Sequence, residues 1–187
     1  MTYLGYHGTN EQNEKNILSM NFRKSTGDNH WFGEGIYFFI DGINAESLDN
    51  LAAQWAIDQA WDNKDRKLKY TNYIVLKATI HLAPETIFDL RDENNNRIFN
   101  QVRNKILEAI KDKGKIINGD YKDSIVFKYI QEKFKIKAII GNVYIRLGIQ
   151  RICKIHSNIS NCTIICVYDN QAISIEDIES VKKGTIE

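Results

Sequence analysis

The sequence predicts one α+β domain in which one or two strongly bent, mixed β-sheets are flanked by helices. A length of 187 residues fits a single domain over 1–187, and a hydrophobic content of 43% is enough for a core. A single proline, Pro84, and the lack of any Gly/Ser-rich stretch leave no obvious interdomain linker. Strand patterns dominate both ends of the chain, with helical patterns between them. Because the two do not alternate strictly, we do not expect a doubly wound parallel sheet.

The expected elements follow from hydrophobic periodicity and from end signals. A short strand at 3–6 precedes a helix that we expect to begin at a capping box of Thr9 and Gln12 and to end near Ser19. Segment 73–82 alternates with period two, which places every second side chain on one buried face. The other expected elements are strands at 35–40, 137–145, 162–168 and 172–175 and helices at 45–61, 97–113 and 123–134.

Composition and charge argue against several classes of protein. The chain has 25 basic and 24 acidic residues, so its overall charge favours neither nucleic acid nor membrane as a partner. Its apolar runs are too short to cross a bilayer, and its N-terminus lacks the features of a signal peptide. We therefore expect a cytoplasmic protein without membrane contact. The cysteines fit no metal-ligand spacing, so we expect no metal site and a reducing compartment in which buried cysteine packs as a small hydrophobe. They are Cys153, Cys162 and Cys166.

Two motifs carry the chemistry of the chain. The first, Tyr-His-Gly-Thr at 6–9, stands at the end of a strand just before a helix. The second is Trp-Phe-Gly-Glu-Gly-Ile-Tyr-Phe-Phe at 31–39, whose glycines are ordinarily turn residues. Taken singly, His7 and Tyr37 have ordinary structural explanations as core side chains. Gly8 favours a binding role for its neighbour, because glycine lets a ligand approach the main chain closely.

Together the two motifs resemble the His-Tyr-Glu group of ADP-ribosyltransferases, which includes the catalytic domains of poly(ADP-ribose) polymerases and diphtheria toxin. Members look like Tyr-His-Gly-Thr/Ser, a short helix, a Gly-Phe/Leu-Arg piece, a loop and Phe-Gly-x-Gly-Ile-Tyr-Phe. Here Asn-Phe-Arg at 21–23 takes the middle place, and the direct match spans 6–56. The resemblance implies the ADP-ribosyltransferase fold, with split and bent mixed β-sheets, and an enzyme that uses NAD+ as its co-substrate.

The resemblance assigns roles in an NAD site to individual residues. His7 would hydrogen-bond ribose hydroxyls, and the main chain of Gly8 would pair with the nicotinamide carboxamide. Tyr37 would stack on the nicotinamide ring. In polymerase-like members a small residue and, three positions later, an aromatic residue follow on the next helix, and Ala52 and Trp55 fit that spacing. Trp55 is then the second wall of the ring pocket, and core packing is its alternative explanation.

Two further positions extend this predicted site. Arg23 would reach the pyrophosphate or adenine end of the cofactor, with a solvated surface charge as the alternative. Thr9 belongs to the predicted NAD-binding set, and the loop at 25–30 would overhang the cofactor. Breaking the nicotinamide–ribose bond creates an oxocarbenium-like centre, so such a site needs rigid positioning more than a strong acid or base.

The third signature residue of the family is a Glu on a later strand, shortly before a Tyr-Asp pair. Aligning that pair with residues 168–169 of this chain puts Ile164 at the Glu position, and no acid lies at 147–167. By resemblance to mono-ADP-ribosylating relatives, this departure implies transfer of a single ADP-ribose unit. The predicted catalytic residues are therefore His7, Tyr37 and Ile164.

The stretch 146–161 corresponds to the loop that faces the acceptor in this family. It holds no Asp or Glu, and its basic residues form a local positive patch suited to RNA, DNA or an acidic protein surface. It also lacks an aromatic residue that could stack on a base, which weakens the nucleic-acid interpretation. A solvated loop without a partner is the alternative. The predicted acceptor-binding residues are Arg146, Arg151, Lys154 and His156.

Other functions stay open at this point. The site could bind NAD or ADP-ribose without catalysis, or it could hydrolyse NAD with water as the acceptor. The NAD-dependent tRNA 2′-phosphotransferases share the fold but carry a His where Tyr37 stands. Few prolines and many Asn, Ile and Lys residues suggest a bacterial or phage protein. For such a chain the resemblance implies a toxin or defence effector, with an antitoxin or immunity protein as a potential partner.

Overall fold

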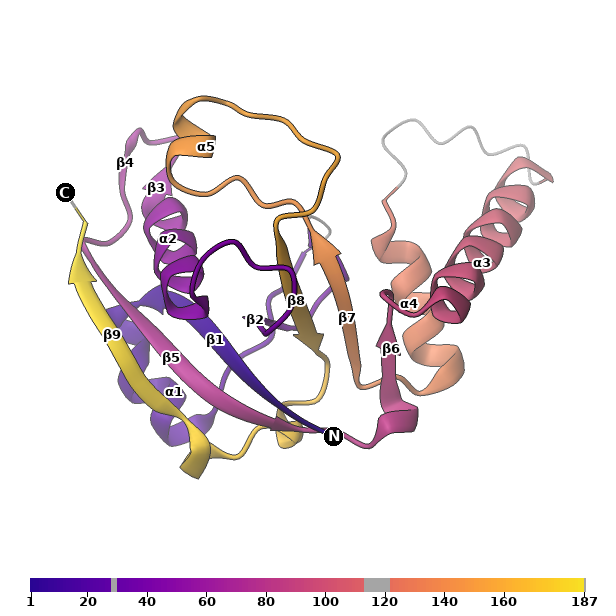
Figure 1. Ribbon diagram of the computed structural model, residues 1–187, viewed down its shortest axis with the longest axis horizontal. Helices are drawn as coiled ribbons and strands as arrows, with labels where there is room; N and C mark the ends of the chain where they lie inside the picture. The colour runs from indigo at the N-terminus through magenta and orange to yellow at the C-terminus, as the bar shows by residue number, and fades with distance from the viewer. Residues whose placement is uncertain (28–29, 113–121, 187) are drawn as a thin grey trace.

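A mixed β-sheet with helices on both faces forms the body of the protein. The computed structural model describes residues 1–27, 30–112 and 122–186. The strands of the main sheet are β1 (Thr2–Asn10), β2 (Ile36–Phe39), β5 (Asn72–His81), β6 (Ile87–Asp89), β7 (Ala138–Val143), β8 (Cys162–Val167) and β9 (Glu179–Thr185). Within the described residues these seven strands lie in the order β6-β7-β8-β2-β1-β5-β9 (Figure 1). The β6–β7 pair is parallel and the other neighbouring pairs are antiparallel, so the expected mixed α+β class is confirmed.

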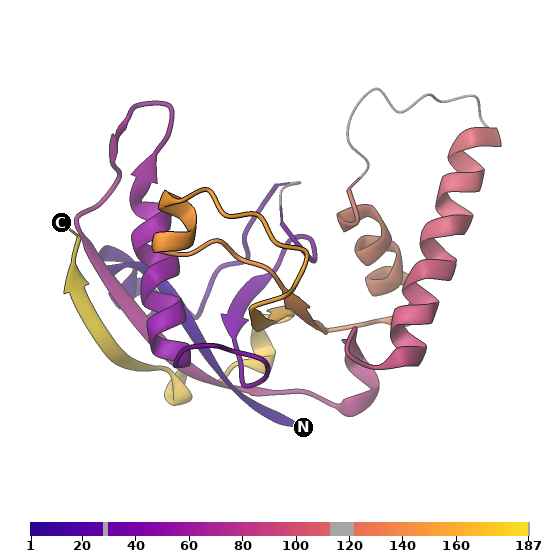
Figure 2. The ribbon, with the colours of Figure 1, turned by 45° about the horizontal axis from the view of Figure 1, so that its top comes forward.

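The helices are distributed over the two faces and one end of this sheet. They are α1 (Glu14–Met20), α2 (Leu48–Ala60), α3 (Glu93–Asp112), α4 (Ser124–Phe134) and the short α5 (Ile149–Ile152). Single 3-10 turns are η1 (Glu11–Asn13), η2 (Pro84–Thr86), η3 (Asn170–Ala172) and η4 (Ile175–Asp177), and β3 (Trp61–Asp62) pairs with β4 (Lys67–Leu68) in a separate hairpin. Figure 2 shows α3 and α4 side by side near β6, whereas α5 and its flanking loop lie beside α2.

The alternation of β5 builds the core on the face that carries α1. Ile74, Leu76, Ala78 and Ile80 are fully buried in one cluster, together with Ile17 of α1. The predicted buried face of segment 73–82 is therefore confirmed. Each buried isoleucine or leucine contributes roughly 1.5–3 kcal/mol by leaving water, so this face is a main source of stability.

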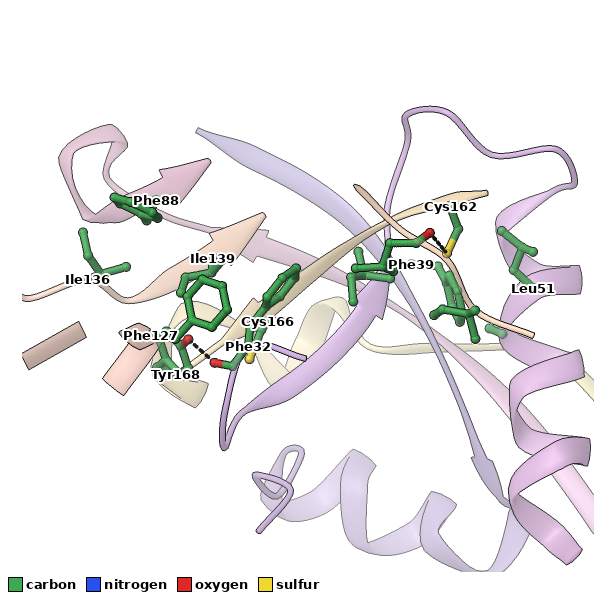
Figure 3. Packing of buried hydrophobic residues seen from close by; sticks show 14 of the residues in the cluster. Phe32, Phe39, Leu51, Phe88, Phe127, Ile136, Ile139, Cys162, Cys166 and Tyr168 are labelled. Carbon is green, nitrogen blue, oxygen red and sulfur yellow. Dashed lines mark hydrogen bonds between the residues drawn. The ribbon is translucent and has the colours of Figure 1, made fainter. Parts of the chain in front are cut away.

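A second core lies on the opposite face, between the sheet and helices α2, α3 and α4. The ring of Phe127 on α4 lies 4.7 Å from that of Phe99 on α3 and 5.2 Å from that of Phe32, measured between centroids. Figure 3 shows Phe32, Phe127 and Tyr168 gathered around one point, with Cys166 beside them. Phe32 belongs to the second sequence motif, so this core anchors the loop of that motif against α4.

The first helix begins differently from the prediction. The chain enters it through the 3-10 turn η1, and the side chain of Asn10 accepts the hydrogen bond from the Gln12 N–H at 3.0 Å. The predicted capping box is therefore wrong, because β1 extends to Asn10 and Thr9 is still part of the strand. The Thr9 hydroxyl instead accepts a hydrogen bond from the Asn13 amide at 2.9 Å.

The C-terminal region also differs from the prediction. The strand expected at 172–175 is replaced by η3 and η4, with one isolated bridge between Ile173 and Ile80. The last strand is β9, whose sequence Glu-Ser-Val-Lys-Lys-Gly-Thr has no apolar face because it is an edge strand with exposed side chains. Position 113, the expected end of the third helix, lies outside the described residues.

The sheet is weakest between β1 and β2, where it nearly divides. All nine residues of β1 are in register with β5, but β1 is in register with β2 at a single pair, Tyr6 with Phe39. The sheet is therefore continuous. In place of the expected split, two neighbouring strands are in register at only one pair of residues. On either side of this point the two strands diverge, and the space between them is the place where the two motifs meet.

Candidate functional site

A cavity of about 450 Å³ lies where β1 and β2 part. Its wall combines both sequence motifs with one side of α2, with Ile145 just after β7 and with Ile164 of β8. Most of the predicted catalytic and NAD-binding residues are therefore brought together, although they are far apart in the chain. The wall is formed by Tyr6, His7, Gly8, Arg23, Ser25, His30, Trp31, Gly35, Ile36, Tyr37, Phe38, Phe39, Trp55, Gln59, Ile145 and Ile164.

His7 is held in one orientation by the neighbouring strand. Its Nδ1 donates a hydrogen bond to the main-chain carbonyl of Tyr37 at 2.8 Å, since a carbonyl can only accept. Burial lowers the pKa of the imidazole below 6.5, and the bond to the Tyr37 carbonyl opposes this only in part. The ring is therefore neutral at pH 7, with Nε2 as a hydrogen-bond acceptor. Such a nitrogen is suited to receive a hydroxyl proton rather than to donate one.

The hydroxyl of Tyr37 is fully engaged within the second motif. It accepts a hydrogen bond from the Phe32 N–H at 2.9 Å and donates one to the Gly33 carbonyl at 2.6 Å. Burial is the main cause that raises the pKa of this phenol, so it stays protonated. The hydroxyl is thus structural, and the ring is the part of Tyr37 that is free to contact a ligand in the cavity.

Two tryptophans complete the aromatic part of the wall. Trp55 projects from α2, as the resemblance implied, and lines the cavity. Trp31 was not given a role in the sequence interpretation, yet its ring lies 5.6 Å from that of Trp55 and 6.3 Å from that of Tyr37. Its position directly before the Phe-Gly-x-Gly segment was the available signal.

Gly8 is required by the packing of α2 against β1. A Cβ at this position would lie 1.8 Å from the carbonyl oxygen of Ala52 and 3.1 Å from the Cβ of Ala56. Ala52 itself is completely buried and is not among the cavity-lining residues. The structure therefore places Ala52 behind the wall, where a small residue lets the helix approach, rather than in contact with a ligand.

The two glycines of the second motif serve different purposes. Gly33 adopts a φ of +87°, which L-residues rarely adopt, so it is a turn residue as expected. Gly35 has a different purpose from the expected turn. A Cβ there would lie 2.4 Å from the sulfur of Cys166, so this glycine lets the chain pass close to β8. Ser25 ties the base of the loop, because its N–H and hydroxyl both donate to the Gly35 carbonyl, at 2.9 and 2.8 Å.

Ile164 forms part of the cavity wall from β8, where it is in register with Phe39 of β2. Its side chain is 2% exposed. Among the described residues of the wall, none carries a carboxylate. Ile164, which the resemblance aligns with the Glu of the family, therefore gives this part of the described wall an apolar side chain.

A smaller hollow of about 190 Å³ adjoins the cavity. His7 and Arg23 line both spaces, so they stand at the junction. Thr9, Asn13 and Asn16 contribute polar groups to the smaller hollow. Arg23 thus borders the cavity with the aromatic rings as well as the smaller hollow, whereas Thr9 lines only the smaller hollow. Of the loop expected at 25–30, residues 28–29 lie outside the described part of the chain.

The predicted acceptor loop lies next to α2, but one of its cations is already paired. Arg151 lies 3.9 Å from the carboxylate of Asp58 on α2, and the same carboxylate accepts the Gly148 N–H at 3.3 Å. Burial raises the pKa of Asp58, and Arg151 opposes this shift. Arg151 is therefore part of an anchor between the loop and α2. Arg146, Lys154 and His156 remain exposed, as an acceptor surface requires.

Exposed isoleucines are the feature of this loop that the sequence interpretation missed. Ile152 and Ile159 are 76% and 77% exposed, and Ile149 is 69% exposed. Ile155 follows at 46%. Together with the exposed Arg146 and Lys154 they make this loop both apolar and basic. The signal in the sequence was a run of isoleucines with neither a strand nor a long helix to bury them.

The cysteines are not paired with one another. Cys162 and Cys166 are buried in β8, as expected for small hydrophobic residues, whereas Cys153 is exposed at the end of α5, contrary to that expectation. Within the described residues, no group of three or more His, Cys, Asp or Glu side chains is arranged to hold a metal ion. None of the described helices is long and apolar enough to span a membrane.

Comparisons with known proteins give little functional information. No family model matches the chain. The chain is 30% identical over 127 residues to an uncharacterized protein of Methanocaldococcus jannaschii. This match covers 67% of the chain and 54% of the other protein, so the chain spans about half the length of that relative.

Proposed function

We propose that the protein is an NAD-dependent mono-ADP-ribosyltransferase with the fold of the His-Tyr-Glu group. The observation that carries this proposal is the convergence of His7, Tyr37 and Trp55 on one cavity at the point where β1 and β2 part. These residues come from three separate elements.

The proposed binding mode follows from the two adjoining spaces. The nicotinamide ring lies in the larger cavity against Tyr37 and Trp55, and Nε2 of His7 accepts a hydrogen bond from a ribose hydroxyl. Arg23 lines the junction with the smaller hollow, and in this mode its guanidinium binds the diphosphate. The neutral state of His7 supports this mode, because only a neutral imidazole has a nitrogen lone pair to accept that hydrogen bond.

The proposed reaction transfers ADP-ribose through an oxocarbenium-like centre. The bond between the nicotinamide nitrogen and the ribose breaks, and its electron pair leaves with nicotinamide, which becomes neutral. A nucleophilic atom of the acceptor forms the new bond to the ribose carbon and loses its proton to solvent or to a nearby base. The protein contributes by fixing the ring and the ribose, which lowers the entropic part of the barrier.

The apolar wall at Ile164 supports transfer of a single unit. Chain elongation in the polymerases of this family uses a carboxylate that polarises the acceptor hydroxyl. An isoleucine offers no hydrogen bond, and none of the described wall residues is acidic. We therefore expect mono-ADP-ribosylation, with the acceptor supplying its own reactive group.

The surface of the loop favours a protein acceptor over a nucleic acid. Exposed isoleucines such as Ile152 and Ile159 match an apolar patch on a protein, and Arg146 and Lys154 match acidic residues around it. A nucleic acid would bind the cations but would leave the isoleucines without partners. The toxin or defence role and the antitoxin or immunity partner that the resemblance implied stay predictions.

The test uses the purified full chain and NAD+ labelled in its adenylate part. A transferase releases nicotinamide and labels a macromolecule when protein, RNA and DNA pools are offered separately. His7→Ala and Tyr37→Ala should lower turnover by about a hundredfold or more, because positioning contributes several kcal/mol to such reactions. His81→Ala, which replaces an exposed histidine on β5, is the matched control and should retain full activity.

The other outcomes select the alternatives. Free labelled ADP-ribose without a labelled macromolecule would identify an NAD glycohydrolase. Calorimetric binding of NAD+ without nicotinamide release would identify a non-catalytic binding module. Absence of both binding and turnover would refute the proposed NAD site.

A further inference from the structure

A second and larger cavity adjoins the second sequence motif. Its volume is about 800 Å³, and it lies between helix α4 and the segment that carries the motif. Residues 32–34 line this space, whereas Trp31 and Tyr37 line the cavity of the proposed NAD site. The two walls have no described residue in common, so the larger space, which we call the lysine groove, is a separate feature. Its charged wall residues are Lys24, Glu34, Lys128, Glu132, Lys135 and Lys137.

Three lysines of the groove have no counter-ion in the described part of the protein. Lys24, Lys128 and Lys135 are exposed, and none of them forms an ion pair with another described residue. Lys137 is different, because its ammonium group lies 3.1 Å from the carboxylate of Asp169. Three of the four lysine ammonium groups are therefore available to a ligand.

The two glutamates of the groove differ in their contacts. One carboxylate oxygen of Glu34 accepts a hydrogen bond from the Gly27 N–H at 2.9 Å, so this side chain is held within its own loop. Glu132 is exposed on α4 and forms no ion pair with another described residue, so its charge opposes the binding of an anion. With four lysines against two glutamates, the groove attracts anions overall.

The spacing of the lysines favours a ligand that carries several anionic groups in a row. Lys128 lies in α4 and Lys135 directly after its end, and seven residues correspond to roughly 10 Å along a helix axis. Lys24 joins the wall from the segment before the second motif. A ligand that contacts all three lysines must therefore present negative charge at more than one position.

The residue types of the wall favour phosphate groups on a small molecule. All the cations of the described wall are lysines, which bind phosphate as point charges, whereas planar carboxylates are matched best by the fork of a guanidinium. The volume of the groove is typical of small-molecule sites, which span about 300–1,000 Å³. Phe32, the aromatic residue of the described wall, is 4% exposed, so the bases of a nucleic-acid strand would find no ring to stack on.

We propose that the lysine groove binds a chain of two or three phosphate groups, either free or as part of a nucleotide. The chain lies along α4, with its oxygens on the ammonium groups of Lys24, Lys128 and Lys135. The carboxylate of Glu132 lowers the affinity. Because the groove shares no described wall residue with the cavity of the proposed NAD site, phosphate binding here is independent of NAD+ cleavage.

The experiment measures the affinity of the full chain for inorganic tripolyphosphate by calorimetry. An ionic strength of about 0.15 M screens charges that lie more than about 8 Å from the ligand. We expect Lys128→Gln and Lys135→Gln each to lower the affinity about fivefold, and Glu132→Gln to raise it about threefold, since each variant changes one exposed charge contact. Lys133→Gln, at an exposed lysine of α4 outside the wall, is the matched control and should keep the wild-type affinity.

A second probe distinguishes the two sources of the phosphate chain. ATP carries the same chain with a nucleoside attached. If ATP binds more tightly than tripolyphosphate and Lys128→Gln weakens both, the groove takes a nucleotide. If tripolyphosphate binds more tightly, with the same dependence on Lys128, the groove takes free polyphosphate. The substituted side chains on α4 are exposed, so each variant should unfold at the wild-type temperature, and a lost affinity is then not a folding defect.

Three results would overturn the phosphate site. The first is the absence of saturable tripolyphosphate binding. The second is a loss of binding in Arg23→Gln with wild-type affinity in the lysine variants, which would place the phosphate chain in the proposed NAD site. The third is equal affinity for a hexaglutamate peptide, which would show that the groove recognises negative charge alone. None of these results depends on nicotinamide release, so the transferase and the lysine groove are tested separately.

Discussion

The cavity and the loop around α5 are neighbours in space but are built in opposite ways. In the cavity, polar groups such as Nδ1 of His7 and the hydroxyl of Tyr37 are bonded within the protein, and the rings point inward. In the loop, Ile152 and Ile159 point into solvent. The pair of Asp58 with Arg151 ties the loop to α2.

This difference indicates that the two regions suit different kinds of binding partner. The cavity is formed by strands whose positions are fixed by pairing along the sheet, so it can recognise one small rigid ligand. The loop offers an apolar and basic surface that is exposed, which suits a larger partner that covers it. Substitutions in the cavity should therefore lower both the free energy of unfolding and the affinity for the ligand. Substitutions in the loop should lower only the affinity for the partner.

The largest effect is expected for Gly8→Ala. The added Cβ would lie 1.8 Å from the Ala52 carbonyl, so α2 must move away from β1 and the cavity must widen. We expect a loss of about 3 kcal/mol in the free energy of unfolding, measured with urea, or no folded protein. Thr9→Ala on the same strand is the control and should cost no more than about 1 kcal/mol. Wild-type stability of Gly8→Ala would show that α2 and β1 are not in close contact.

A smaller loss in the free energy of unfolding is expected when the pH is lowered, and it arises from His7. Its pKa lies below 6.5 in the folded protein, so the unfolded chain binds a proton first as the pH falls. The stability that His7 contributes is therefore complete above pH 6.5 and is lost below it, at up to about 1.4 kcal/mol per pH unit until the folded pKa is reached.

The pH effect is measured as the free energy of unfolding at about pH 7.5 and about pH 5.5, in the wild type and in His7→Gln. The variant should lose less stability on acidification than the wild type. Phe38→Leu, a substitution without a titratable group in the core beside His7, is the control and should lose as much stability on acidification as the wild type. Greater acid loss in His7→Gln would mean that the imidazolium is the form stabilised in the folded protein, and would remove the acceptor role of Nε2.

The smallest effect on stability is expected for the double variant Ile152→Ser/Ile159→Ser. Both side chains are already exposed, so the free energy of unfolding should change by no more than about 0.5 kcal/mol. Labelling of protein acceptors from NAD+ should fall about fivefold or more, because the apolar contact is lost. Ile175→Ser, at an exposed isoleucine in η4, is the control. Unchanged labelling by the double variant would exclude the loop as the acceptor surface.

Local patterns in the sequence were reliable where one element has one buried face. The alternation over 73–82 predicted the core-facing side chains of β5, and the helical pattern over 45–61 located α2. The same approach failed for β9, whose exposed edge position leaves no apolar pattern, and for the start of α1, where strand pairing extends β1 through Thr9 and so moves the cap to Asn10.

The two motifs nominated His7 and Tyr37 as partners through the family that they resemble, and the spacing of Ala52 and Trp55 added Trp55 by the same resemblance. The near division of the sheet between β1 and β2, the withdrawal of Ala52 behind Gly8, the pairing of Arg151 with Asp58 and the position of Trp31 became visible only in three dimensions. Periodicity records which side of an element is apolar. It does not record which elements meet or where paired strands diverge, since those depend on contacts between residues far apart in the chain.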